Sequence, residues 1–173
     1  MIGLALDLSG RTGYVLGDLA GRPEPKVLSL AVEGHGSDEA AARFAIWLRN
    51  VFESPSRPAM IVVEKAMAAS AQRGGYASEM TMKLHGVLIA LTACYQIPVD
   101  RVAAATMRKL FTGRGTYANR KEAKAASIRA AKFHGFLDKW DSDDDKADAA
   151  GLFYWLGHTR GIAQKKLQAA IPF

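Results

Sequence analysis

The order of the apolar segments is the feature that most constrains the fold of this chain. Three strand-like runs bounded by glycine and proline come first, at 2–8, 13–19 and 26–32. Two further strand-like runs, at 59–66 and 97–102, are flanked by helical patterns. Short connections predict an antiparallel meander at the start, and the later alternation predicts parallel strands joined through helices. The sequence therefore predicts an α/β fold whose five-stranded mixed sheet is flanked by helices.

The starts of three helices can be predicted from capping residues. Ser37 is the expected N-cap of the first helix, and Ser78 that of a long apolar helix over 78–96. Asn119, with Glu122 three residues later, has the spacing of a capping box and predicts the start of a basic helix.

The composition is that of a soluble globular protein, with 49% hydrophobic and 23% charged residues. We expect one domain over 1–173, with 158–173 as a C-terminal tail of unassigned role. Cys94 is the single cysteine, so no internal disulfide can form, which fits a reducing compartment. No signal peptide is recognisable, and no apolar run approaches the roughly 18 residues of a membrane helix. We therefore expect a cytoplasmic protein without a membrane contact.

The positive charge is concentrated in one segment. The whole chain has a net charge of +6, but residues 101–132 alone hold nine basic residues and one acid, Glu122. Such a local excess suggests a polyanionic partner, although a solvated basic helix face would produce the same pattern. The basic residues of the segment are Arg101, Arg108, Lys109, Arg114, Arg120, Lys121, Lys124, Arg129 and Lys132.

The densest negative charge lies directly before an apolar run, in "WDSDDDKADAAGLFYWLG" at 140–157. Acids at a helix start are ordinarily explained by the helix dipole, at about 0.3–1 kcal/mol each. Asp148 fits that explanation less well, because it precedes "AAGLFYWL" and a buried charge costs several kcal/mol unless it is paired or metal-bound. Asp145 lies three residues earlier on the same helical face, and Asp144 is the alternative partner.

Two of the predicted strands end in a carboxylate, Asp7 and Glu64. Each has a structural alternative, because Asp7 could begin the turn "DLSGRTG" and Glu64 could form a salt bridge. Together with the helical D-x-x-D pattern, however, they suit hard divalent cations, which prefer oxygen ligands. Two Mg²⁺ ions roughly 3.5–4 Å apart, with Mn²⁺ as an alternative, would support phosphodiester hydrolysis.

From residue 2 to about 157, the chain resembles the RuvC-type Holliday-junction resolvases, which are nucleases with a ribonuclease H-like fold. The acids occur in the same order, and a glycine-containing basic loop precedes a lysine-rich helix start. The segments that carry the resemblance are "GLALDLSGRTGY", "PAMIVVEKA", "MKLHGVLIA", "IPVDRVAAATMRKLFTGRGTYANRKEAK" and "DKADAAGLFYW".

The resemblance implies a Mg²⁺-dependent endonuclease that cuts two strands of a four-way DNA junction symmetrically as a homodimer. The family's acids correspond to Asp7, Glu64, Asp145 and Asp148, which would be both catalytic and metal-binding. Its DNA-contacting basic residues correspond to Arg108 and to Arg120 or Lys121. With the local charge, the expected phosphate-binding residues are Arg108, Arg114, Arg120, Lys121 and Lys124.

One position departs from the family pattern. The family often carries an aromatic junction wedge three residues after the strand-end glutamate, where this chain has Met67. Tyr76, beyond a glycine-containing loop, is the candidate substitute. Two alternatives therefore stay open: a nuclease for branched or flap DNA with the same fold, and a catalytically silent junction-binding module.

Overall fold

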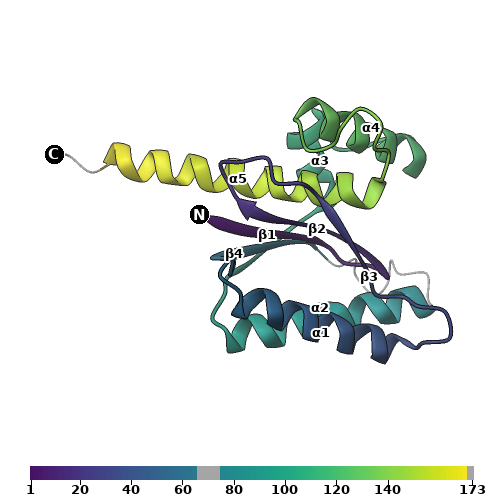
Figure 1. Ribbon diagram of the computed structural model, residues 1–173. Helices are drawn as coiled ribbons and strands as arrows, with labels where there is room; N and C mark the ends of the chain where they lie inside the picture. The colour runs from purple at the N-terminus through teal and green to yellow at the C-terminus, as the bar shows by residue number, and fades with distance from the viewer. Residues whose placement is uncertain (66–74, 171–173) are drawn as a thin grey trace.

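The computed structural model describes residues 1–65 and 75–170, and the side chains of 1–65 and 75–160. Within these residues, five strands form one sheet in the order β3-β2-β1-β4-β5 (Figure 1). The β1–β2 and β2–β3 pairs are antiparallel, and the β1–β4 and β4–β5 pairs are parallel, as predicted. The strands are β1 (Ile2–Asp7), β2 (Arg11–Asp18), β3 (Lys26–Ser29), β4 (Met60–Glu64) and β5 (Val99–Val102).

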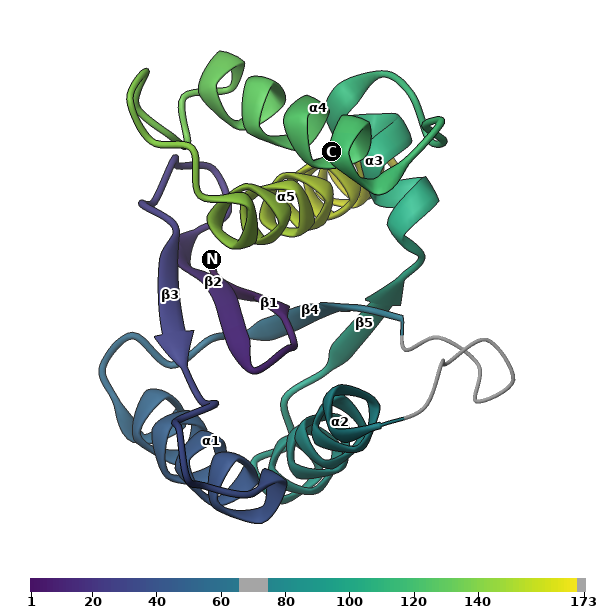
Figure 2. The same cartoon turned by 90° about the vertical axis from the view of Figure 1, so that its right-hand side faces the viewer.

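Helices cover both faces of the sheet (Figures 1 and 2). Side chains alternate along β1, so that Leu4 and Leu6 pack in the core beneath α1 and α2, while Ala5 packs in the core beneath the other helices. One layer consists of α1 (Ser37–Glu53) and α2 (Tyr76–Cys94). The other consists of α3 (Ala104–Thr112), α4 (Arg120–Phe133) and α5 (Asp144–Ala170).

No helix in the part of the chain that the structure describes is both long enough and apolar enough to cross a membrane.

The third strand is shorter than predicted. It ends at Ser29, because the backbone N–H groups of Leu30 and Ala31 both donate to the carbonyl oxygen of Gly10, each at 2.8 Å. This bifurcated contact turns the chain out of the β2–β3 ladder and toward α1.

Two of the three predicted N-caps are wrong, and the third is confirmed. Gly36 caps α1, with its N–H donating to Glu39 at 2.9 Å, while the Ser37 hydroxyl donates instead to Glu79 of α2. The long helix α2 begins at Tyr76, two residues before Ser78. Asn119 does cap α4, because its side chain accepts a hydrogen bond from the Glu122 N–H at 2.9 Å. Serine is a common cap residue, but the glycine before a helix can take the same extended backbone conformation.

Close packing at a glycine brings the start of α5 down onto the sheet. Gly13 of β2 pairs with Asp7 of β1, and a Cβ atom at Gly13 would overlap the backbone oxygen of Asp145. Farther along α5, a Cβ atom at Gly151 would lie 2.6 Å from the sulfur of Met107 in α3. The absence of side chains at these glycines therefore sets the depth at which α5 sits, and with it the position of its acids.

Candidate metal centre and nucleic-acid interface

Asp7 and Glu64 lie side by side at the carboxyl ends of the neighbouring inner strands β1 and β4. Leu6 of β1 pairs with Val63 of the parallel strand β4, and the two acids are the next residues of their strands. Burial raises the pKa of Asp7 to about 7, and the charges of Asp148, Glu64 and Asp145 add to the effect. Burial also raises the pKa of Glu64. The structure thus places Asp7 near enough to Glu64, Asp145 and Asp148 for their charges to interact.

Asp148 is the acid whose position is hardest to explain structurally. It lies in α5 between the fully buried Ala147 and Ala149, and its Oδ1 atom is buried without a hydrogen-bond partner among the residues that the structure describes. Burial is the main reason that its pKa is raised. The hydroxyl of Ser127 in α4 is also buried and lacks a partner at normal hydrogen-bond geometry, yet it lies near enough to favour the ionised form of Asp148. No feature of the sequence indicated a role for this serine.

The aspartates that precede Asp148 have local partners. Asp143 caps α5, because its Oδ1 atom accepts hydrogen bonds from the N–H groups of Asp145 and Lys146 at 3.1 and 3.2 Å. Asp141 accepts from the Asp143 N–H at 2.9 Å and forms an ion pair with Lys146 at 2.8 Å. Lys146 is the main cause of the lowered pKa of Asp141, and a hydrogen bond from Arg11, aided by the helix N–H groups, lowers the pKa of Asp143. Both acids are therefore satisfied without a metal ion.

Arg11 links two of these acids, a contact that the sequence analysis missed. Its guanidinium group, at the start of β2, forms ion pairs with both Asp143 and Asp145. Because Asp143 is itself fixed by the helix backbone, it holds Arg11 in a position where the guanidinium orients the Asp145 carboxylate. Arg11 lies in "DLSGRTG", but nothing in that motif indicates a partner more than a hundred residues away.

Asp144 and Asp145 differ in their surroundings. Asp144 forms an ion pair with Lys124 of α4. The charge of Asp145, and not that of Asp144, is among those that raise the pKa of Asp7. Asp145 therefore faces the strand-end acids more directly than Asp144 does.

Two cations from the neighbouring helices partly balance the cluster. The charge of Arg108, from α3, lowers the pKa of Glu64 and Asp148. Lys124 does the same for Asp7 and Asp148. These effects are smaller than that of burial, so the net result is still a raised pKa for all three acids.

The donor set fits a hard divalent cation. Within the described part of the chain, Asp7 and Glu64 make no side-chain hydrogen bond or ion pair, so their oxygens are available as ligands. The Oδ1 atom of Asp148 lacks a partner that a metal ion would supply. Within the described residues, the three acids whose oxygen atoms all lie within 4.8 Å of one another are Asp143, Asp144 and Asp145, so this group contains Asp145 alone of the four predicted ligands. Carboxylate oxygens are the ligands that Mg²⁺ and Mn²⁺ prefer.

Three of the predicted phosphate-binding residues share a cavity with Asp144. Arg120, Lys121 and Lys124 line a surface cavity of about 590 Å³ together with Ala125, Ile128, Ser142 and Asp144. Arg114 is placed differently, in the α3–α4 loop, where its guanidinium stacks over the Tyr117 ring at 5.4 Å and approaches Glu122 at 4.0 Å. The first three cations thus lie beside Asp144, and Lys124 also acts on Asp7 and Asp148, while Arg114 lies beside its own loop.

The two candidate wedge residues have different outcomes. Met67 lies outside the described residues. Tyr76 begins α2 with 49% of its surface exposed, and its hydroxyl donates to the carbonyl oxygen of His35 at 3.1 Å. Tyr76 is therefore accessible, but its hydroxyl is held by the segment that precedes α1.

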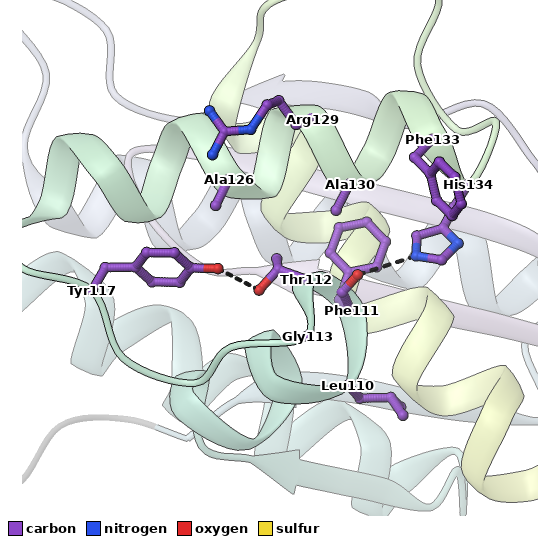
Figure 3. Close-up of a pocket in the computed structure, with 10 residues that line it drawn as sticks. All are labelled: Leu110, Phe111, Thr112, Gly113, Tyr117, Ala126, Arg129, Ala130, Phe133 and His134. Carbon is purple, nitrogen blue, oxygen red and sulfur yellow. Dashed lines mark hydrogen bonds between the residues drawn. The ribbon is translucent and has the colours of Figure 1, made fainter.

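A second cavity, of about 510 Å³, lies between α3 and α4 (Figure 3). Tyr117 points toward Thr112, with their hydroxyls 2.6 Å apart, and the His134 ring lies 3.1 Å from the carbonyl oxygen of Phe111. Its lining includes Arg129 and the exposed Phe133 but none of the four predicted acids. This cavity is therefore separate from the acid cluster.

The fold has close counterparts among solved structures. RuvC of Thermus thermophilus matches with a TM-score of 0.68 at 15% identity, over 93% of this chain and 96% of that chain. The chain has the RuvC fold. RuvC of the same organism in complex with Holliday junction substrate matches with a TM-score of 0.71 at 16% identity, with the same coverage. No protein-family model matches the sequence, and a search of curated proteins finds no match. The resemblance to RuvC is thus confirmed at the level of the fold.

Proposed function

We propose that this protein is a metal-dependent endodeoxyribonuclease that resolves four-way DNA junctions, as in recombination, repair or phage DNA processing. The observation that carries the proposal is the cluster of Asp7, Glu64, Asp145 and Asp148 at one edge of a RuvC-like sheet. Three of these acids have raised pKa values, and one has a buried oxygen without a partner. Such an arrangement is unfavourable unless a cation occupies it.

In this proposal Asp7, Glu64, Asp145 and Asp148 hold Mg²⁺, with two ions per site. When bound, the ions supply an activated water molecule and stabilise the charge that develops on the phosphate. Asp7 must lose its proton to serve as a ligand, and Lys124 assists because its charge lowers the pKa of that carboxyl. Arg11 would orient Asp145, and Arg108 lies near enough to Glu64 and Asp148 to contact a bound phosphate.

The proposed substrate is branched DNA. The cations Arg120, Lys121 and Lys124 line a cavity that also includes Asp144, beside the acids, and would hold backbone phosphates near the cleaved bond. Arg114 would bind phosphate at the outer loop. A RuvC structure of the same fold is in complex with a Holliday junction substrate, which supports this class of substrate.

We further propose a homodimer, because two symmetric cuts require two sites related by a two-fold axis. The long apolar helix α2 is the candidate interface. Met82 and Ile89, seven residues apart on α2, are each more than half exposed, which supports a partner on this face.

The test is to incubate the protein with a synthetic four-way junction, with and without Mg²⁺, and to map the cuts. Resolution requires paired, symmetric cuts that depend on the metal and leave 5′-phosphate and 3′-hydroxyl ends. Flap and linear duplex DNA serve as comparison substrates. Equal cutting of linear duplex would overturn the resolvase assignment. Cutting of flaps as well as junctions would favour the broader branched-DNA nuclease, an alternative motivated by Met67 at the position of the family's aromatic wedge. Binding without any cleavage would favour the silent junction-binding module.

A further inference from the structure

Trp140 is an exposed aromatic residue in the loop between α4 and α5. It is 81% exposed, whereas the other two tryptophans of the chain, Trp47 and Trp155, are half-buried. Its position three residues before the cap of α5 places it on the segment that leads directly into the acid cluster.

The loop that carries Trp140 is fixed by hydrogen bonds. The Asp138 side chain accepts from the N–H groups of Trp140 and Asp141 at 2.7 and 2.9 Å. The Lys132 ammonium donates to the carbonyl oxygen of Lys139 at 2.8 Å. The Trp140 backbone is therefore held in place before any partner binds, and binding to its ring requires little ordering of the loop.

Both acids and cations lie near Trp140: the aspartates of 141–145 follow it in the chain, and Lys139 contacts its ring. The ammonium group of Lys139 lies over the indole ring, 4.8 Å from its centroid. Ser142, two residues after Trp140, lines the same cavity as Arg120, Lys121 and Lys124. An exposed aromatic ring with cations close by is a combination by which proteins bind single-stranded nucleic acid. Bases stack on the ring while the cations hold the phosphates. An acidic protein partner could pair with these cations, but it would not require an exposed indole ring.

We propose that Trp140 stacks against an unpaired base of the DNA substrate, next to the cleavage site, while Lys139 contacts the adjoining phosphate. This inference rests on the proposed function. A base inside a duplex has both faces covered by its neighbours, so Trp140 would favour DNA whose stacking is interrupted, as at a branch point. Trp140 thereby supplies an aromatic contact that is independent of Met67 and Tyr76.

Tryptophan fluorescence tests the contact directly. The measurement uses the Asp148→Asn protein, so that DNA is bound without being cut, and compares a four-way junction with a linear duplex of the same composition. We expect the junction to quench the emission and to protect it from acrylamide, and the duplex to do so less. The same titration with Asp148→Asn/Trp140→Phe should show little change, because the remaining tryptophans are half-buried.

Affinity measurements provide a second arm with a matched control. Phe133 is 86% exposed on α4 and lines the other cavity, so Phe133→Ala removes an equally exposed ring away from the site. We expect Trp140→Ala to weaken junction binding roughly 5- to 150-fold, the range measured for loss of one stacked base. Trp140→Phe should keep most of the affinity, and Phe133→Ala should change it less than twofold.

The outcomes separate the two proposals. If the wild-type protein cuts junctions and Trp140→Ala binds them as tightly as Phe133→Ala does, the stacking inference fails and the proposed function stands. If the wild-type protein binds no branched DNA, both fail. If Trp140→Ala instead abolishes a concentration-dependent self-association seen by sedimentation, Trp140 belongs to a protein interface and the inference is overturned.

Discussion

At the scale of single residues, the acids of the α5 start differ mainly in what neutralises them. Asp141 and Asp143 are paired with a cation and with backbone N–H groups, and Asp144 and Asp145 each have a cationic partner. Asp148 has a buried oxygen with no partner, although its main chain is part of a regular helix. Among the proposed metal ligands, the unfavourable charge therefore falls on Asp7, Glu64 and Asp148, whose pKa values are raised, and not on Asp145, which Arg11 neutralises.

Replacement of Asp148 should separate stability from activity. Because a carboxylate with a raised pKa is destabilising when ionised, we expect Asp148→Asn to unfold at a higher urea concentration than the wild type at pH 8 without metal. The same variant should lose junction cleavage. Asp141→Asn is the matched control, because it removes the ion pair with Lys146 and should lower stability slightly while cleavage persists. A metal-free Asp148→Asn protein that is less stable than the wild type would contradict this explanation.

The raised pKa of Asp7 predicts a specific pH dependence. Its pKa is about 7 in the folded protein and about 3.8 in the unfolded chain, so between these values the folded state binds more protons. Stability of the metal-free protein should therefore fall as the pH rises from about 4 to 7, by up to about 1.4 kcal/mol per pH unit.

Acids with lowered pKa values, such as Asp143, have the opposite effect, because their contribution to stability is lost as the pH falls. They are present in both proteins, so comparing the wild type with Asp7→Asn isolates the effect of Asp7. The difference in urea midpoint between the two proteins should change across this window. An unchanged difference from pH 4.5 to 7.5 would show that Asp7 titrates normally.

The acids could be predicted from the sequence because their local context is unusual. Asp7 and Glu64 end apolar strands, and Asp148 adjoins an apolar helical run, so each is a charge next to a buried segment. The role of Arg11 could not be predicted, because an exposed arginine has many possible partners and Asp145 is 134 residues away. Ser127 was missed for a similar reason: a small polar residue in a helix carries no signal of its burial.

At the scale of the elements, the site depends on how closely α5 approaches the sheet. The antiparallel meander, the later parallel strands and the flanking helices followed from apolar periodicity and from the lengths of the connections. The depth of α5 did not, because it depends on a contact between Gly13 of β2 and the backbone of Asp145. A glycine in a strand suggests that another segment approaches the strand closely, but it does not indicate which segment.

Gly13→Ala should push the start of α5 away from β2. A Cβ atom there would overlap the backbone oxygen of Asp145, which cannot move without its helix. We expect a loss of stability of about 1–3 kcal/mol in urea unfolding and a marked loss of metal-dependent cleavage. Gly86→Ala is the control, since a Cβ atom at this position in α2 would meet nothing within 4 Å. It should stabilise the protein by about 0.5–1 kcal/mol. Wild-type stability and activity in Gly13→Ala would refute the role given to this contact.

At the scale of the whole molecule, the two helical layers differ in charge. The segment 101–132, with nine basic residues and one acid, runs from the last residues of β5 through α3 and nearly all of α4, which lie in the same layer as α5. The layer of α1 and α2 lies on the opposite face of the sheet (Figure 2). A polyanion should therefore approach the molecule from the side of α3, α4 and the acid cluster.

This asymmetry predicts how DNA affinity depends on salt. Each phosphate that is neutralised contributes about −0.9 to the slope of log affinity against log salt concentration. We expect Arg120→Ala and Lys121→Ala each to reduce the magnitude of the slope for a four-way junction by about that amount. Arg49→Ala, which removes an exposed cation of α1, should leave the slope unchanged. A wild-type affinity that is nearly independent of salt would contradict the proposed footprint.

The spread of the proposed ligands along the chain also has a consequence for biosynthesis. Asp7 and Glu64 leave the ribosome long before Asp148, and at roughly 5–20 residues per second the interval between Glu64 and Asp148 lasts about 4–17 seconds. During that time the sheet edge carries two acids and no α5. A nascent or truncated chain would therefore hold no complete set of ligands, and cutting of DNA would begin only after the last helix has docked.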